Sequence, residues 1–230
     1  MRERKILTLL VLFILGITLV MGAPDPSGAT LTPGASSRGT NPGVGNLSAQ
    51  AGNVTALNID QTRITDIWQG YYGNVSGSIV LENSAGNNFY DWTIAAITGE
   101  VYASRNTVSS WSSINCTNRT QWEAEETALN IGSTLTDGIN ETYNANNHPA
   151  FDVGTRTMNS CPSTRPYNAT GVAGQFWNIL LNSDVTNVIY ASRLADNSNS
   201  FDNGTADFEI LVPTNRTTGL STYFFYVELY

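Results

Sequence analysis

After about Asn53 the chain alternates between short runs rich in β-branched and aromatic residues and clusters of Asn, Gly, Ser and Asp. Such runs predict β-strands, and the polar clusters between them predict turns. The runs cover residues 75–81, 89–94, 100–104, 176–181, 188–192, 208–212 and 223–230. The pattern therefore predicts an all-β fold, an antiparallel β-sandwich of about 8–11 strands.

One segment has the pattern of a helix instead. Thr120 and Glu123 have the spacing of a capping box, and Gly132 lies where a helix would end. Trp122 and Leu129 then fall on one face, seven residues apart. We expect one short helix near residues 121–131.

The first 48 residues differ in character from the rest. Residues 1–23 have a basic head, an apolar stretch and small residues before Pro24, which is typical of a secretory signal peptide. An uncleaved N-terminal membrane anchor is the alternative, because the apolar stretch is close to the shortest length that spans a bilayer. Residues 24–48 are rich in Pro, Gly, Ser and Thr and predict a linker. Residues 49–230 are then a single β-sandwich domain.

The two cysteines, Cys116 and Cys161, fit an exported chain, because disulfides persist outside the cytoplasm. We expect them to pair and to pin a long, turn-rich loop at residues 133–172. His148 is the only histidine, which argues against a zinc site at these cysteines.

The chain contains many Asn-x-Ser/Thr sequons, which accept N-linked glycans in exported proteins. The glycosylation candidates are Asn46, Asn53, Asn74, Asn115, Asn118, Asn140, Asn168, Asn203 and Asn215. The formal net charge is −8 and the arginines are scattered, so no basic stripe is present to follow phosphates. We therefore expect no nucleic-acid partner.

Four segments together resemble a group of exported archaeal cell-surface β proteins of unassigned function. The segments are residues 51–55, 68–77, 99–104 and 223–227. The resemblance covers most of the chain after the linker. It implies an archaeal surface protein with a β fold, and it carries no catalytic residues.

No catalytic set stands out from the residues themselves. The aromatics Trp68, Tyr71 and Tyr72 are candidates for stacking on sugar rings, although aromatics in a β-sandwich are also common in the core. Calcium is the one candidate cofactor, at Asp196, Asp202 and Asp207 in an oxygen-rich loop. Glu123, Glu125 and Glu126 could supply paired carboxylates, but acids in the first turns of a helix also complement its dipole.

These features predict an extracellular or cell-surface glycoprotein without enzymatic activity: a surface-coat, adhesin or filament subunit. Its expected partners are other envelope proteins or copies of itself, with glycans as an alternative, and it would touch the membrane only through an uncleaved N-terminal segment. In one version, residues 49–59 are a strand donated to the next subunit. A carbohydrate-binding module is the second hypothesis, and an exported hydrolase is the third.

Overall fold

The computed structural model describes residues 24–94, 97–184 and 186–230. The chain is mostly β, and its strands pair antiparallel, so the predicted fold class is confirmed. The strands are β1 (Ser27–Gly28), β2 (Trp68–Gly73), β3 (Ser78–Glu82), β4 (Asn88–Thr93), β5 (Gly99–Ser104), β6 (Asn115–Cys116), β7 (Phe151–Val153), β8 (Arg156–Met158), β9 (Ser163–Thr164), β10 (Asn178–Asn182), β11 (Val188–Arg193), β12 (Ser198–Asn199), β13 (Thr205–Ala206), β14 (Phe208–Pro213) and β15 (Phe224–Leu229). The helices are α2 (Arg119–Ala128) and α3 (Ile139–Thr142).

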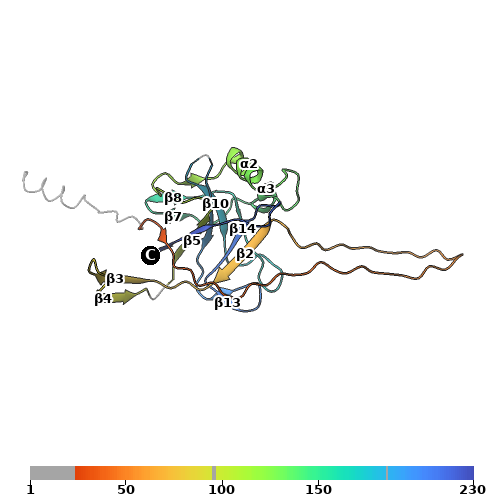
Figure 1. Cartoon of the computed structure of the whole chain (residues 1–230), viewed down its shortest axis with the longest axis horizontal. Coiled ribbons are helices and arrows are strands. Elements are labelled where there is room, and N and C mark those ends of the chain that lie inside the picture. The colour runs from red at the N-terminus through yellow and green to blue at the C-terminus, as the bar shows by residue number, and fades with distance from the viewer. Residues whose placement is uncertain (1–23, 95–96, 185) are drawn as a thin grey trace, which may run out of the picture.

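A seven-stranded sheet forms the centre of the molecule, in the order β1-β15-β5-β11-β10-β6, with β9 also paired to β10 (Figure 1). Strands β5 and β10 are buried at every residue. Leu180 faces one side of the sheet and Leu181 the other, and both are fully buried. Because both faces of these strands are covered, even polar residues within them, such as Glu100 and Asn178, are buried.

The first face of the central sheet packs against the two-stranded sheet β2–β14 and against α2 and α3. The core on this side contains Ile67, Ala103, Leu129, Ile131, Ile139, Tyr143, Leu180, Val188, Tyr190, Ile210 and Val212. The small sheet over the large one is the sandwich that the strand pattern predicts, although the two sheets do not close into a barrel.

The opposite face is covered by the β7–β8 hairpin and by the loop that leads into β6. The core on this side contains Tyr102, Trp111, Ile114, Phe151, Val153, Met158, Cys161, Ile179, Leu181, Ile189 and Ala191. The predicted loop at 133–172 supplies much of this layer and contains α3 and β7–β9.

Helix α2 begins two residues before the predicted start. Its N-cap is Asn118, whose side chain accepts from the Gln121 backbone N–H while the Gln121 side chain accepts from the Asn118 N–H. This capping box replaces the predicted one at Thr120 and Glu123. The helix ends before Asn130, which adopts a left-handed φ of 55°, so Gly132 is not its terminator.

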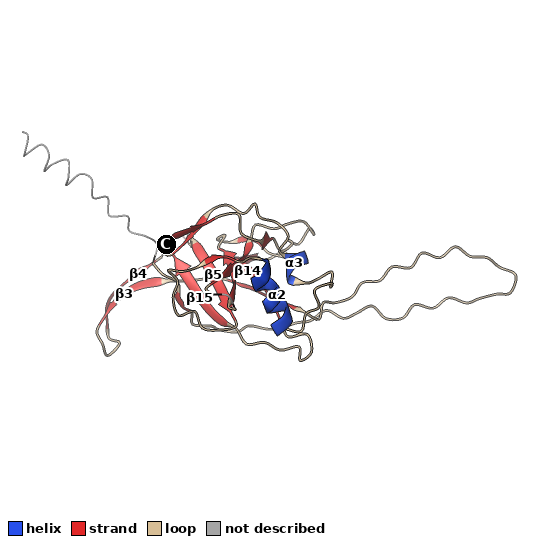
Figure 2. Cartoon of the chain, turned by 90° about the horizontal axis from the view of Figure 1, so that it is seen from above, coloured by secondary structure: helices blue, strands red, loops and turns tan. Residues whose placement is uncertain are grey.

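Two segments project from opposite ends of the body (Figures 1 and 2). One is the β3–β4 hairpin. The other, which we call the arm, is residues 42–63, an extended loop whose base is tied where the Ile64 N–H donates to the Asn41 side chain over 2.7 Å. The arm turns at Gln50–Asn53, where Gly52 has a φ of 88°.

The chain before the arm starts on the body. Ser27 and Gly28 pair with Val227 and Tyr226, so the first residues of the predicted linker add an edge strand to the central sheet. Much of the segment 49–63, predicted to belong to the domain, lies instead in the arm. The predicted signal or anchor at 1–23 lies outside the described residues, and no helix within the described ranges is long and apolar enough to cross a membrane.

Candidate functional site

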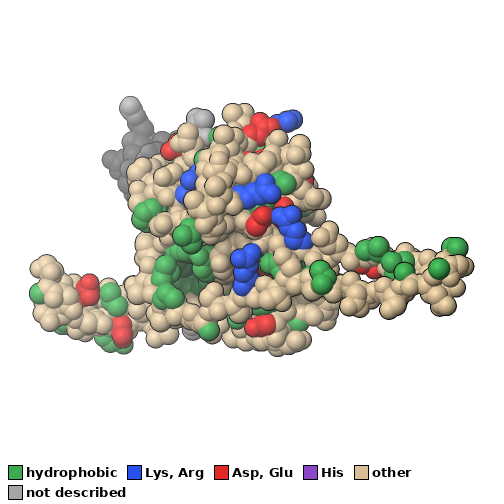
Figure 3. All heavy atoms as spheres, turned by 45° about the vertical axis from the view of Figure 1, so that its right-hand side comes forward, with side chains coloured by type: hydrophobic (Ala, Val, Ile, Leu, Met, Phe, Trp, Pro, Cys, Tyr) green, Lys and Arg blue, Asp and Glu red, His purple; other side chains and the backbone are tan. Residues whose placement is uncertain are grey.

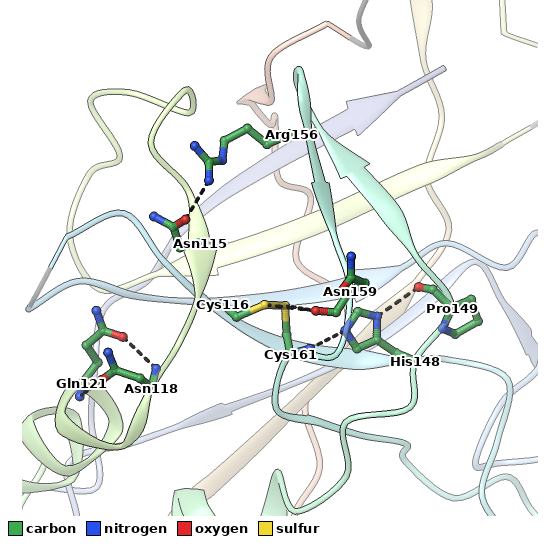
Figure 4. Close-up of a disulfide and its surroundings, with 9 residues drawn as sticks. All are labelled: Asn115, Cys116, Asn118, Gln121, His148, Pro149, Arg156, Asn159 and Cys161. Carbon is green, nitrogen blue, oxygen red and sulfur yellow. Dashed lines mark hydrogen bonds between the residues drawn. A yellow bond between two sulfur atoms is a disulfide. The ribbon is translucent and has the colours of Figure 1, made fainter.

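The predicted disulfide is present between Cys116 on β6 and Cys161, with their Cα atoms 4.9 Å apart (Figure 4). His148 lies beside it, and its Nε2 accepts from the Cys161 backbone N–H over 2.9 Å. The other ring nitrogen, Nδ1, lies 3.0 Å from the Pro149 carbonyl, so it carries the ring proton. Burial lowers the pKa of His148, which holds the ring neutral. This histidine therefore orders the disulfide loop.

Two carboxylates lie side by side inside the central sheet. Glu100 on β5 is the cross-strand partner of Glu228 on β15, and both side chains are buried. Burial raises the pKa of Glu100 to about 8, and it also raises the pKa of Glu228. Two like charges facing each other in a sheet would destabilise it, so the raised pKa values favour a proton on this pair.

Diagonal tyrosines satisfy the carboxyl oxygens. The Tyr102 hydroxyl donates to Glu228 over 2.8 Å, and the Tyr230 hydroxyl donates to Glu100 over 2.9 Å. The Gly154 N–H donates to the other oxygen of Glu228, which links β15 to the β7–β8 hairpin. Because solvent does not reach either carboxylate, this cluster fixes the last strand rather than presenting an acid–base pair to a substrate.

The sequons lie at the surface. Asn46, Asn53, Asn74, Asn115, Asn118, Asn140 and Asn203 are exposed, and Asn168 and Asn215 are partly exposed. At Asn168 and Asn215 the side-chain oxygen closes a turn by accepting backbone N–H groups, and among the described residues the amide nitrogen has no hydrogen-bond partner. Asn118 and Asn140 border a shallow depression beside the disulfide. Glycan attachment at these sites stays a prediction.

The three candidate stacking aromatics do not form one platform. Trp68 is half-buried, and its indole N–H donates to the Asp137 carbonyl over 2.6 Å. Tyr71 and Tyr72 are neighbours in β2 and therefore point to opposite faces. Tyr71 packs edge-on against Phe225, whereas Tyr72 packs against Phe201. Tyr72 alone has an acid near its hydroxyl, Asp202 at 3.3 Å.

The three candidate calcium ligands are each engaged separately. Asp207 is buried and accepts from the Val75 and Asn197 backbone N–H groups. Asp202 accepts from the Ser200 hydroxyl, which lowers its pKa, and Asp196 accepts from the Asn197 amide. Over the residues whose placement is described, no three His, Cys, Asp or Glu side chains gather at one point.

The helix glutamates have structural partners that the sequence pattern did not reveal. Glu125 is buried and receives two bonds from the Arg105 guanidinium, at 2.7 and 2.6 Å. Glu126 accepts from the Ile139 N–H over 2.8 Å at the start of α3. Only Glu123 stays exposed, paired with Arg119 along the helix. Glu125 and Glu126 tie α2 to its neighbours, because Arg105 and the start of α3 lie outside the helix.

Among the described residues, the two projections together carry more than half of the large exposed apolar side chains. Apolar side chains are visible on both projections in Figure 3. On the hairpin these are Ile79, Val80, Leu81, Phe89, Tyr90 and Trp92, and on the arm they are Val44, Leu47, Val54, Leu57 and Ile59. Soluble monomers rarely expose contiguous apolar patches unless these mark an interaction site. The projections are therefore the best candidate functional surfaces.

Comparison with protein-family models, with curated proteins and with solved structures found no match to this chain.

Proposed function

We propose that this chain is an exported, N-glycosylated structural or interaction protein of the cell envelope, a non-catalytic subunit that assembles with copies of itself or with neighbouring surface proteins. One observation carries the proposal: two apolar projections leave the body at opposite ends and lie uncovered in the single chain. Such surfaces cost free energy in water unless a partner covers them.

Three further features support the same function. The disulfide suits an oxidising compartment. Every sequon asparagine is accessible at least in part, as a glycoprotein of an archaeal or other cell surface would require. The buried acids Glu228, Glu125 and Glu126 bond to neighbouring strands and helices. Together these features favour a durable extracellular subunit over a hydrolase.

The test is the assembly state of the chain purified after export, measured by size-exclusion chromatography with light scattering and by electron microscopy. We expect multimers or filaments whose size grows with concentration. A chain that stays monomeric at every concentration and does not bind isolated envelopes would contradict the proposal. Mass spectrometry of the same sample identifies the mature N-terminus and the occupied sequons.

A carbohydrate-binding function is the second candidate, and Tyr72 is the observation that favours it. Its ring is half exposed and its hydroxyl lies beside the Asp202 carboxylate, a pairing suited to a sugar ring. Binding on a glycan array that is lost in Tyr72→Ala and retained in Tyr90→Ala would support this function. Equal binding by both variants would exclude this site.

A further inference from the structure

The β3–β4 hairpin has one coherent apolar face. Ile79 lies opposite Trp92, and Leu81 lies opposite Tyr90. Since side chains alternate between the faces of a strand, these four share one face. Val80 and Asp91 lie on the other face, paired with each other. In the part of the chain that is described, no further strand pairs with either edge of the hairpin.

A hairpin with unpaired edges and an uncovered apolar face lacks the packing that stabilises sheets. An isolated two-stranded hairpin is marginally stable in water, and a third strand or a packed partner is usually needed. The four side chains of its apolar face are 49–61% exposed. The hairpin therefore has both the free edges and the uncovered face of an acceptor for another strand.

The arm provides a segment suited to that role. Its return leg, residues 54–59, has no Pro or Gly, and Leu57 and Ile59 share one face of an extended chain. The outgoing leg contains Pro42, Gly43 and Gly45, which disfavour a strand. Edge strands usually carry charges that prevent pairing, but residues 42–59 contain no charged side chain. The return leg is thus an unprotected strand.

The arm and the hairpin cannot meet within one molecule, because they leave the body at opposite ends in both views (Figures 1 and 2). We infer that the return leg of the arm of one copy adds as a third strand to the β3–β4 hairpin of a second copy. The inference rests on the proposed function and names its contact. Since the two surfaces differ, each copy can give one arm and receive another, and the assembly grows head to tail.

A face-to-face contact between two hairpins is the competing arrangement. Four half-exposed side chains per copy, at about 200 Å² for a fully exposed side chain, bury roughly 900 Å² in total. Stable interfaces bury about 1,200 Å² or more, so this contact alone is small. Addition of the arm covers apolar side chains from both projections and satisfies main-chain groups along a strand edge. The arm is therefore the favoured occupant.

A pair of matched variants tests which side of the return leg binds. Leu57→Asp places a charge on the face shared with Ile59, whereas Val54→Asp places the same charge on the opposite face of the same leg. Leu57 is 62% exposed and Val54 is 101% exposed, so both chains should fold and melt as the parent does. We expect Leu57→Asp to raise the concentration needed for assembly roughly tenfold or more. Val54→Asp should change it much less.

Cross-linking tests the contact itself. The native cysteines are paired, so thiols introduced by Leu57→Cys and Leu81→Cys would be the only free ones. With a short bis-maleimide, the double variant should give a ladder of covalent multimers. A mixture of the two single variants should give covalent dimers, and each single variant alone should give no covalent multimer. A Thr155→Cys variant, exposed in the β7–β8 turn of the body, replaces Leu57→Cys as the matched control.

The outcomes separate this inference from the proposed function. If the parent assembles but the mixed variants form no covalent dimer, the arm–hairpin contact is refuted and the proposed function stands. Covalent dimers from Leu81→Cys alone would show the face-to-face contact instead. If Leu57→Asp assembles like the parent, the return leg is not the donor. A parent chain that neither assembles nor binds isolated envelopes refutes both, whereas one that binds envelopes without assembling refutes the arm–hairpin contact alone.

Discussion

Replacement of Glu100 by Gln should remove much of the pH dependence of this protein's stability. Glu100 lies fully buried on β5, across from Glu228, and receives the Tyr230 hydroxyl. Burial is the main cause that raises its pKa from 4.5 to about 8. The amide of Gln keeps an oxygen for Tyr230 and has the same shape, but it cannot ionise.

The sign follows from the raised pKa. The stability that Glu100 contributes is fully present below pH 4.5 and is lost as the pH rises to about 8, because the unfolded chain ionises first. The loss is about 1.4 kcal/mol per pH unit. The lowered pKa of His148 acts in the opposite direction below its ordinary value of 6.5. Between pH 6.5 and 8 the effect of Glu100 is therefore cleanest, at about 2 kcal/mol.

The assay is urea denaturation at pH 6.5 and pH 8, followed by tryptophan fluorescence with the disulfide oxidised. The parent should lose about 2 kcal/mol more between these pH values than Glu100→Gln does. Glu228, whose pKa burial also raises, remains in the variant. Glu82→Gln on the exposed hairpin serves as the control and should behave like the parent. An unchanged decrease in Glu100→Gln would refute the buried, protonated state of this carboxyl.

Three other changes test the fold. Replacing both Cys116 and Cys161 by Ser should lower the free energy of unfolding by about 4 kcal/mol in urea titrations, because the disulfide closes a loop with a sequence separation of 45. No loss would mean that the disulfide does not restrict the unfolded chain. Gly99→Ala should lower the free energy of unfolding by about 3 kcal/mol or more in the same assay, since Gly99 has a φ of 133° and an added Cβ would strike the backbone of β15. An unchanged free energy of unfolding would contradict this. Without glycans, Asn118→Ala should cost about 1 kcal/mol and Thr120→Ala almost nothing, and the reverse order would restore Thr120 as the helix cap.

Local sequence pattern was enough to place the central strands. The runs at 100–104, 188–192 and 208–212 match β5, β11 and β14 within a residue or so, because β-branched and aromatic side chains dominate there. Strand β2 was not predicted, since Trp68–Gly73 contains two glycines and becomes a strand through its pairing with β14. The helix was predicted, but its cap was not, because Asn118 and Thr120 are both good capping residues.

The burial and the partners of the acidic residues could not be predicted from the sequence. In the sequence, Glu100 and Glu228 look like ordinary surface glutamates in alternating strands. They lie 128 residues apart along the chain. Only the register of β15 on β5 brings them together and buries them. The same applies to Glu125, whose partner Arg105 precedes it by 20 residues on another element.

The sequence alone determined the β fold, the disulfide and the sequons, because these depend on residue type, period and spacing along the chain. It could not decide which strands are inside. The runs at 75–81 and 89–94 have the same apolar alternation as the core strands, yet they form the exposed hairpin, and residues 42–63 leave the body as the arm. Periodicity fixes which side chains share a face, whereas burial depends on what packs against that face. That choice belongs to the tertiary structure, and it is the basis of the proposed assembly.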